Sequence, residues 1–178
     1  MEIEIIKYFQ SLKTPLFDAI MWIFTTMASI YFVILLFIFL YFFSKKKYSF
    51  IFIICTAFNV GINYLLKIII NRKRPYEISS EIINVTNSLG KSMPSGHMVC
   101  ATTIVIFLLL IFWKKLDSRG KKSLAIIFGI IFLLLVGVSR MYFGQHYPTD
   151  LIAGVGVGTI LTVCEIFILR RLYKQKKV

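Results

Sequence analysis

Residues 139–150, SRMYFGQHYPTD, form a short polar stretch between two long apolar runs. One apolar run ends at Ser139, and the next begins near Pro148. An arginine, a histidine and an aspartate therefore lie where one apolar segment ends and another begins. The second of the two histidines lies in PSGH, residues 94–97, directly before another apolar run. Polar side chains thus gather at the ends of apolar segments, and this alternation indicates how the chain is folded.

The apolar runs predict a membrane protein. Hydrophobic residues make up 58% of the 178 residues, and the mean hydropathy is +0.80. Runs of about 16 to 25 apolar residues recur, and about 20 are enough for a helix to cross a bilayer. Several runs are apolar on every side, whereas helices around a soluble core would carry a polar face. We predict an all-α integral membrane bundle of five to six helices, with residues 1–178 in a single domain.

Five spans and an amphipathic first helix are expected. Charged and apolar residues alternate over 2–18, which indicates a helix on the membrane surface with a break at Pro15. The predicted spans are 19–43, 49–70, 98–113, 123–139 and a last one that begins near 148.

Small residues within the spans have structural explanations. Cys55, Cys100 and Cys164 occur singly in apolar runs, so we interpret them as small buried residues, with neither a disulfide framework nor a metal site. The glycines at 154, 156 and 158 include GxxxG spacing, which favours close helix packing within one molecule over a dimer interface.

A third polar element, KIIINRKRP at 67–75, ends the predicted second span. Lys67 and Arg74 are seven residues apart, so a continuous helix would place them on one face, about 10 Å apart along its axis. Asn63 lies one turn before Lys67 on that face, and Pro75 disfavours helix at the preceding residue. A lysine costs about 2.5 to 3.5 kcal/mol at the centre of a bilayer, which makes Lys67 a functional candidate. The alternative is a lysine that extends to the membrane interface.

PSGH fits the start of a helix that binds an anion. Pro94 favours a helix start, while Ser95 and Gly96 offer a hydroxyl and unobstructed amides. The unpaired N–H groups and positive dipole end of a helix start bind phosphate oxygens well. His97 would then stand beside that anion. Taken alone, the tetrapeptide also fits an ordinary turn.

His146 and Asp150 are four residues apart at the start of the last predicted span. In a helix this spacing places the carboxylate against the imidazole, where it holds one ring nitrogen protonated and leaves the other free to attack. An isolated pair of this kind is more often a surface pair. Here the pair lies at the same membrane face as a second histidine and three cations.

The positive charges predict which side that face occupies. We attribute the net charge of +13 to the cytoplasmic loops of a membrane protein, not to binding of nucleic acid. Segments 44–48, 113–122 and 170–178 share one side of the predicted topology and hold 13 of the 21 basic residues. Because basic loops mark the cytoplasmic side, we expect all three polar elements to face the extracytoplasmic side.

Together the elements KxxxxxxRP, PSGH and SRxxxxxHxxxD, in this order and at these separations, resemble the three signature motifs of the type 2 phosphatidic acid phosphatase family. The resemblance covers residues 67–150 by motif, and the matching positions are Lys67, Arg74, Pro75, Pro94, Ser95, Gly96, His97, Ser139, Arg140, His146 and Asp150. It implies a membrane-embedded lipid phosphatase, similar to the shorter bacterial members of the family, that uses no metal or other cofactor.

The resemblance also implies a role for each side chain. His146, oriented by Asp150, would attack phosphorus and form a phosphohistidine, and His97 would protonate the leaving oxygen and later activate water. The phosphate oxygens would be held by Lys67, Arg74, Ser95, Gly96 and Arg140. Because the two imidazoles must then be in opposite protonation states, we expect a bell-shaped pH profile.

A site at the membrane face favours a lipid phosphate as the substrate. Undecaprenyl diphosphate, phosphatidylglycerophosphate and phosphatidic acid all remain candidates, and LFDAIM at 16–21 resembles small bacterial undecaprenyl diphosphate phosphatases. The alternative is a protein that binds or transports anionic lipids without chemistry. Its cations would suffice for that role, and it would not need a histidine paired with Asp150.

Overall fold

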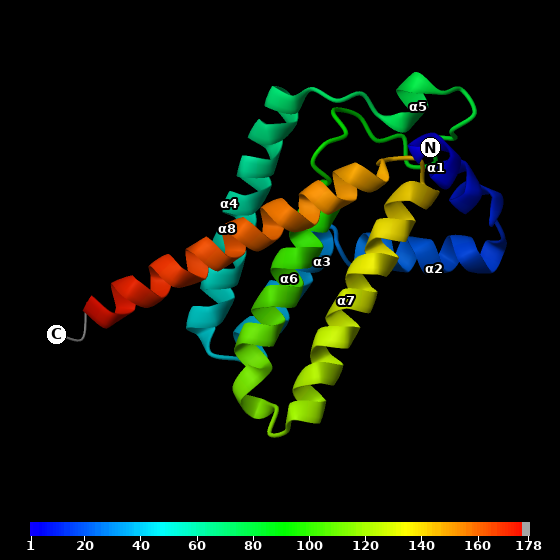
Figure 1. The fold of residues 1–178 in the computed structure, drawn as a ribbon. Helices are drawn as coiled ribbons and strands as arrows, with labels where there is room; N and C mark the ends of the chain where they lie inside the picture. The colour runs from blue at the N-terminus through cyan, green and yellow to red at the C-terminus, as the bar shows by residue number, and fades with distance from the viewer. Residues whose placement is uncertain (176–178) are drawn as a thin grey trace.

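The computed structural model describes residues 1–175, in which every regular element is a helix. The predicted all-α bundle is therefore confirmed (Figure 1). The elements in chain order are α1 Glu2–Ser11, α2 Pro15–Thr26, α3 Ile30–Phe43, α4 Lys46–Ile70, α5 Pro75–Ile78, α6 Gly96–Phe112, the short 3-10 helix η1 Trp113–Lys115, α7 Arg119–Tyr142 and α8 Pro148–Gln175.

The long helices have the length and composition of membrane spans. Four segments qualify, Lys46–Ile78, Gly96–Lys115, Arg119–Tyr142 and Pro148–Leu169, and the bent pair α2–α3 would be a fifth. Large apolar side chains remain exposed on their outer faces, as at Phe58, Phe128 and Ile152. Contact of such surfaces with lipid tails costs no free energy, whereas their exposure to water does. The chain is a multi-pass membrane protein.

The first predicted span, 19–43, is not one straight helix. It is divided between α2 and α3, which meet at an angle of 60°. Ser29 precedes α3 in an extended conformation, and its hydroxyl donates to the carbonyl of Thr26 at 2.7 Å. Short hydroxyl side chains compete in this way with the helical backbone, which explains a break within an otherwise apolar run. The predicted break at Pro15 is confirmed, since α2 begins there with Thr14 as its cap.

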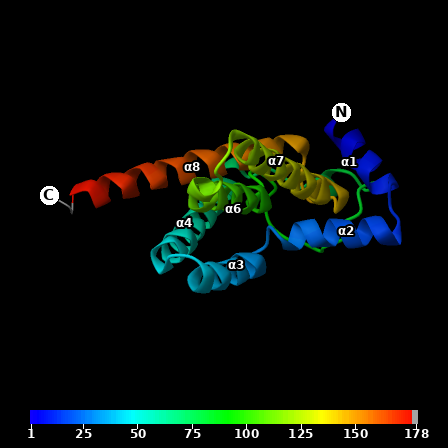
Figure 2. The same cartoon turned by 90° about the horizontal axis from the view of Figure 1, so that it is seen from below.

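The helix α6 lies at the centre of the bundle and packs against α4, α7 and α8. Seen from below, α1 and α2 lie on the α7 side, away from the far end of α8 (Figure 2). Gly154 and Gly158 allow α8 to approach α6 closely, because added Cβ atoms would lie 2.7 Å from the Ser95 carbonyl oxygen and 3.1 Å from that of Val99. Packing within the molecule therefore explains two of the three glycines, while Gly156 faces open space.

The polar ends of the helices gather on one side of the molecule. The C-terminal ends of α4 and α7 and the N-terminal ends of α6 and α8 lie toward α1, whereas the α3–α4 and α6–α7 turns lie at the opposite end (Figure 1). This is the grouping expected from alternating spans. Part of the predicted basic tail, residues 176–178, lies outside the described residues.

The cysteines differ in burial. Cys55 and Cys100 are buried as expected, but Cys164 is exposed. It lies on the outer face of α8, where Ile160, Val163 and Phe167 are exposed as well. Its surroundings are therefore those of a lipid-facing residue.

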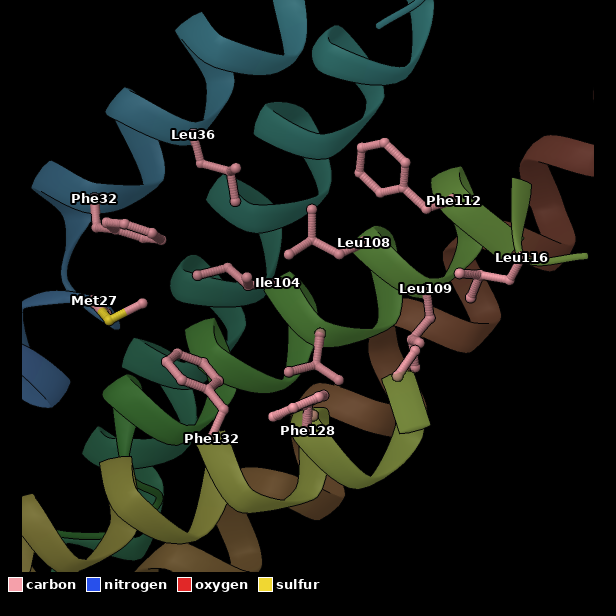
Figure 3. Close-up of a pocket in the computed structure, with 13 residues that line it drawn as sticks. Met27, Phe32, Leu36, Ile104, Leu108, Leu109, Phe112, Leu116, Phe128 and Phe132 are labelled. Carbon is pink, nitrogen blue, oxygen red and sulfur yellow. The ribbon is translucent and has the colours of Figure 1, made fainter. Parts of the chain in front are cut away.

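An apolar pocket of about 410 Å³ lies between α3, α6 and α7 (Figure 3). Phe32, Ile104, Leu108, Phe128 and Phe132 are among its lining residues, and every lining side chain is apolar. None of the predicted site residues contributes to it. The pocket has no side chain that could act as an acid, a base or a nucleophile. Such side chains lie instead at the polar ends of the helices.

Candidate active site

His146 and Asp150 lie side by side where α8 begins. His146 Nδ1 is 3.5 Å from Asp150 Oδ2, and both side chains are buried. His146 precedes α8 and is not helical, so the contact arises from the loop and not from the helical spacing assumed in the sequence analysis. Asp150 Oδ2 also accepts a hydrogen bond from the Tyr147 backbone at 2.9 Å, which caps the first turn of α8.

Two further groups hold the Asp150 carboxylate. Arg72 donates to Asp150 Oδ1 at 2.7 Å, and the Ser92 hydroxyl makes a short hydrogen bond to Asp150 Oδ2. The Ser92 oxygen is also 3.5 Å from His146 Nδ1. The carboxylate therefore has partners on both oxygens, and its orientation toward the imidazole is fixed.

Lys67 and Arg74 both reach the loop before α6. Lys67 Nζ donates to the carbonyls of Lys91 and Ser92 at 2.6 and 3.0 Å. Arg74 donates to the Gly90 carbonyl at 2.8 Å and to Gln145 Oε1 at 2.9 Å. Lys67 is therefore hydrogen-bonded to this polar loop, and its side chain does not extend to the membrane interface as the alternative interpretation required.

The continuous helix expected from Lys67 to Arg74 does not exist. Helix α4 ends at Ile70, because Asn71 adopts the left-handed conformation with φ 52°. Asn tolerates this conformation better than most residues and often ends a helix. Arg74 follows in an extended conformation, as Pro75 dictates for the residue before it. Because the helix ends at Asn71, Arg74 contacts the same loop as Lys67 from the extended segment that follows α4, and not from the same helix face.

The PSGH element begins α6 as predicted. Ser95 is the N-cap, Gly96 is the first helical residue and His97 is the second. The Ser95 backbone N–H donates to the Asp150 carbonyl at 3.1 Å, which joins the starts of α6 and α8. The Ser95 hydroxyl is fully buried, and it has no hydrogen-bond partner among the described residues.

Arg140 lies at the end of α7, where 3% of its surface is exposed. One terminal nitrogen makes a short hydrogen bond to the hydroxyl of Thr25 in α2, while the Nε atom has no partner among the described residues. Ser139 is buried beside it and donates to the Val136 carbonyl at 2.6 Å. Arg140 therefore retains an unused donor in a buried position.

The second histidine belongs to the same cluster. His97 is half-buried, and it lies within electrostatic range of His146, Arg140, Arg74 and Lys67. Burial, together with the nearby positive charges of Arg140, Lys67 and Arg74, lowers the pKa of His146 to about 3, against the opposing effect of the hydrogen bond to Asp150. At neutral pH the His146 imidazole is thus uncharged and retains a lone pair, as a nucleophile requires.

The positive charges of the site are only partly balanced. Arg72 forms ion pairs with Asp150 and Glu2. In the described part of the chain, no salt bridge links Lys67, Arg74 or Arg140 to a carboxylate. Buried cations without counterions are costly. An anion bound between them would remove that cost, so the cluster has the electrostatics of an anion site.

Several residues of the site were not found from the sequence. Arg72 lies within KIIINRKRP but outside the signature positions, so its charge was the one available signal. Ser92, Gln145 and Thr25 have ordinary polar side chains, and nothing in the sequence distinguishes them. Glu2 lies in another helix, far along the chain, and its contact with Arg72 is visible only in three dimensions.

Metal ligands do not cluster in this site. Among residues 1–175, no group of three or more His, Cys, Asp or Glu side chains is arranged to hold a metal ion. Apart from the carboxylates of Asp150 and Glu2, which pair with Arg72, the polar groups of the site are cations, hydroxyls, amides and two imidazoles. Such donors hold phosphate oxygens directly.

The fold is shared with two solved protein structures. A crystal structure of a transmembrane PAP2 type phosphatidylglycerolphosphate phosphatase from Bacillus subtilis superposes with a TM-score of 0.78, at 22% identity, over 96% of this chain and 85% of that one. Aquifex aeolicus LpxE superposes with a TM-score of 0.72, at 24% identity, over 93% of this chain and 94% of that one. At these identities the likeness establishes the fold.

Sequence relatives point the same way. Phosphatidylglycerophosphatase B of Bacillus subtilis is 35% identical over 102 residues, which is 56% of this chain and 47% of that protein. Undecaprenyl-diphosphatase BcrC of Bacillus subtilis is 30% identical over 100 residues, again 56% of this chain and 47% of that protein. The alignments thus span less than half the length of these relatives. Residues 48–175 match the PAP2 superfamily as a whole, and this chain belongs to that superfamily.

Proposed function

We propose that the protein is a membrane phosphatase that hydrolyses a lipid phosphate or diphosphate through a phosphohistidine intermediate. The observation that carries the proposal is a group of three cations beside an uncharged His146: Arg74 and Arg140 are buried, and Lys67 is half-buried. None of the three cations forms a salt bridge with a carboxylate among the described residues. A phosphate group supplies the missing negative charge, and its phosphorus then lies next to a nucleophile.

The first step would transfer the phosphoryl group to His146. Its Nδ1 faces Asp150, so Nε2 is the nitrogen free to attack. A bond forms between Nε2 and phosphorus while the bond from phosphorus to the leaving oxygen breaks. His97 donates a proton to that oxygen as it departs, which makes the lipid alcohol or lipid phosphate a better leaving group.

The second step would release inorganic phosphate. His97, now without its proton, takes one from a water molecule, and the water oxygen attacks phosphorus. The Nε2–phosphorus bond breaks, and His146 returns to its uncharged form. Two displacements thus replace a single direct attack by water.

The remaining residues of the site would bind the phosphate oxygens. The unused donors, Arg140 Nε and the Ser95 hydroxyl, are already buried at the site. The Gly96 amide lies in the first turn of α6, where backbone N–H groups bind anions. Lys67 and Arg74 add positive charge that stabilises the transition state. This mechanism uses side chains and backbone amides of the protein together with a water molecule, and no step in it involves a metal ion.

A lipid is the substrate class that suits the position of this site. The proposed catalytic residues lie at the ends of helices long enough to cross a membrane, so a phosphate on a lipid head can reach them from the side. Phosphatidylglycerophosphatase B, undecaprenyl-diphosphatase BcrC and lipid A 4'-phosphatase are names of its relatives. Phosphatidylglycerophosphate, undecaprenyl diphosphate and phosphatidic acid are the substrates to test first.

We also propose that the site faces the extracytoplasmic side. The turns at 44–48 and 113–122 are rich in lysine and arginine, and they lie at the end of the bundle opposite the site (Figure 1). Basic loops of this kind remain in the cytoplasm.

Phosphate release by the purified protein in detergent tests the catalytic function. Wild-type protein should release phosphate from at least one of the three lipids, and His146→Ala should lose at least about 10³-fold in kcat, because no nucleophile remains. A protein that binds or transports anionic lipids would instead retain these lipids without turnover, and His146→Ala would leave that binding unchanged. Turnover that survives in His146→Ala would rule out the proposed nucleophile.

A further inference from the structure

A carboxylate from the first helix reaches into the ion-pair network of the site. Glu2 Oε2 is 2.7 Å from a terminal nitrogen of Arg72. Glu2 Oε1 accepts hydrogen bonds from the Thr149 hydroxyl at 2.7 Å and from the Thr149 backbone N–H at 3.1 Å. Glu2 therefore connects the segment after α4 with the first turn of α8, directly beside Asp150.

Arg72 connects Glu2 with Asp150, because it bonds to both carboxylates. Its other terminal nitrogen donates to the Thr149 hydroxyl at 2.6 Å and to Asp150 Oδ1 at 2.7 Å. The guanidinium carbon also lies 4.0 Å from the centre of the Tyr147 ring. A flat guanidinium held at both ends and against a ring has one orientation. Arg72 is thus a rigid connection between Glu2 and Asp150.

The position of Glu2 is itself supported by the rest of α1. Gln10 donates to the carbonyls of Ile83 and Tyr142 at 2.8 and 3.2 Å, and it accepts from the Ile83 backbone at 3.1 Å. Ile6 is fully buried between these contacts and Glu2. Helix α1 is therefore fastened to the site end of α7 along its length. It also lies before residue 48, where the match to the superfamily begins.

We propose that Glu2, acting through Arg72, is a positioning residue for Asp150 and hence for the His146 nucleophile. This inference rests on the proposed function. Arg72 fixes Oδ1 of the carboxylate, which leaves Oδ2 directed at His146 and the Tyr147 backbone. Without Arg72 the carboxylate is held only at Oδ2, by Ser92 and the Tyr147 backbone, so its orientation toward the imidazole, which selects the tautomer, is less well fixed.

Glu2 has a second effect on the same arginine. An arginine beside an anion site competes for the substrate unless its own charge is engaged. The pairing with Glu2 and Asp150 engages both terminal nitrogens of Arg72, so its role is to hold the carboxylate and not the phosphate. Loss of Glu2 should therefore reduce the rate of the chemical step without weakening substrate binding.

The test is a double-mutant cycle on kcat and KM with phosphatidylglycerophosphate in detergent micelles. Glu2→Gln and Arg72→Met should each lower kcat by about 10- to 100-fold, with KM changed less than about twofold, because neither residue contacts phosphate. The double variant should be no slower than Arg72→Met, since Glu2 acts through the arginine. Arg72→Lys should recover only part of the rate, because a lysine cannot bridge two carboxylates in a fixed plane.

Matched controls separate positioning from general damage. Glu4→Gln removes a carboxylate of α1 that pairs with Lys7, and Lys73→Met removes an exposed cation next to Arg72. Both should leave kcat within about twofold of wild type. Melting temperatures in detergent show that each variant is folded. A melting temperature lowered in Glu2→Gln with kcat unchanged would mean a purely structural role, and would overturn the inference.

Other outcomes overturn it as well. If Glu2→Gln lowers kcat further in the Arg72→Met background, Glu2 acts by another route. If Arg72→Met raises KM and leaves kcat unchanged, Arg72 binds substrate instead of positioning Asp150. If the wild-type protein shows no turnover, the proposed function itself is wrong. The wild type is therefore measured first, before any variant is compared with it.

Discussion

Burial of His146 decides how the proposed nucleophile behaves. The imidazole is 2% exposed, and its surroundings hold three cations and one carboxylate. Charging such a ring is unfavourable, so its pKa falls from 6.5 to about 3. At pH values well above 3 the imidazole is therefore uncharged and able to attack. Of the two limbs of the expected bell-shaped profile, the acid limb of kcat/KM should lie below pH 5 in the free enzyme.

The same shift makes stability depend on pH. Between pH 6.5 and 3 the unfolded chain binds a proton at His146 that the folded protein does not, so the free energy of unfolding falls as pH falls. At pH 5 the free energy of unfolding should be about 2 kcal/mol lower than at pH 7.5 because of this residue. His146→Asn removes the titrating group, so melting temperatures in detergent should decline less between these pH values in the variant. Parallel declines in the two proteins would contradict the burial of an uncharged imidazole.

At the residue scale, the sequence predicted the residues whose type and spacing are distinctive. His97, His146 and Asp150 could be named because histidines are rare in this chain and lie at the ends of spans. Arg72 and Glu2 could not, because a surface ion pair and a partly buried connection between two elements look alike in a sequence. Their importance depends on which side chains meet, and only the fold determines that.

At the scale of elements, the ends of the helices position the side chains of the site. The starts of α6 and α8 are joined by the hydrogen bond from Ser95 to the Asp150 carbonyl. Gly154, in the second turn of α8, lets the two helices come close enough to form it. The close contact of α6 and α8 therefore sets the distance between the two halves of the site.

This contact can be tested with a matched pair of glycines in α8. Gly154→Ala should lower the stability by about 1 to 3 kcal/mol and reduce kcat, because the new Cβ would lie 2.7 Å from the Ser95 carbonyl oxygen. Gly156→Ala meets no atom within 4 Å and should not destabilise the protein, since alanine favours helix. Melting temperature and turnover of both variants give the comparison. Equal effects at the two positions would show that α8 does not depend on close packing at Gly154.

Sequence reasoning located the long helices but not their interruptions. Apolar length identifies α4, α6, α7 and α8, because lipid imposes that length on any span. The break between α2 and α3 depends on local hydroxyl contacts, and the end of α4 depends on the left-handed conformation of Asn71. Hydropathy reports apolar content and not hydroxyl contacts or backbone dihedral angles, so it does not reveal these features.

At the scale of the whole molecule, alternating spans bring the three signature segments to one end. Arg74 bonds to Gln145, Ser92 to Asp150, and Ser95 to the Asp150 carbonyl, so segments far apart in sequence meet there. The sequence predicted this convergence from span count and charge alone. It could not predict that α1 and α2 would also reach this end, through Glu2 and Thr25.

The proposed orientation can be tested by labelling introduced cysteines in intact cells. In a background in which Cys55, Cys100 and Cys164 are replaced, Lys91→Cys should react with a thiol reagent that does not cross membranes. Lys121→Cys, in the basic α6–α7 region, should react only after the cells are permeabilised. The reverse pattern would place the site in the cytoplasm.

The most direct test of the account is to trap the phosphorylated enzyme and identify the modified residue by mass spectrometry. His97→Ala should accumulate it when supplied with 4-nitrophenyl phosphate, whose leaving group departs without a proton, because the variant lacks the group that activates water. The account predicts phosphate on His146 of this variant, in an amount approaching one per molecule, and none when His146 is also replaced. Turnover by the wild type with no phosphohistidine trapped in His97→Ala, or phosphate on any other residue, would contradict it.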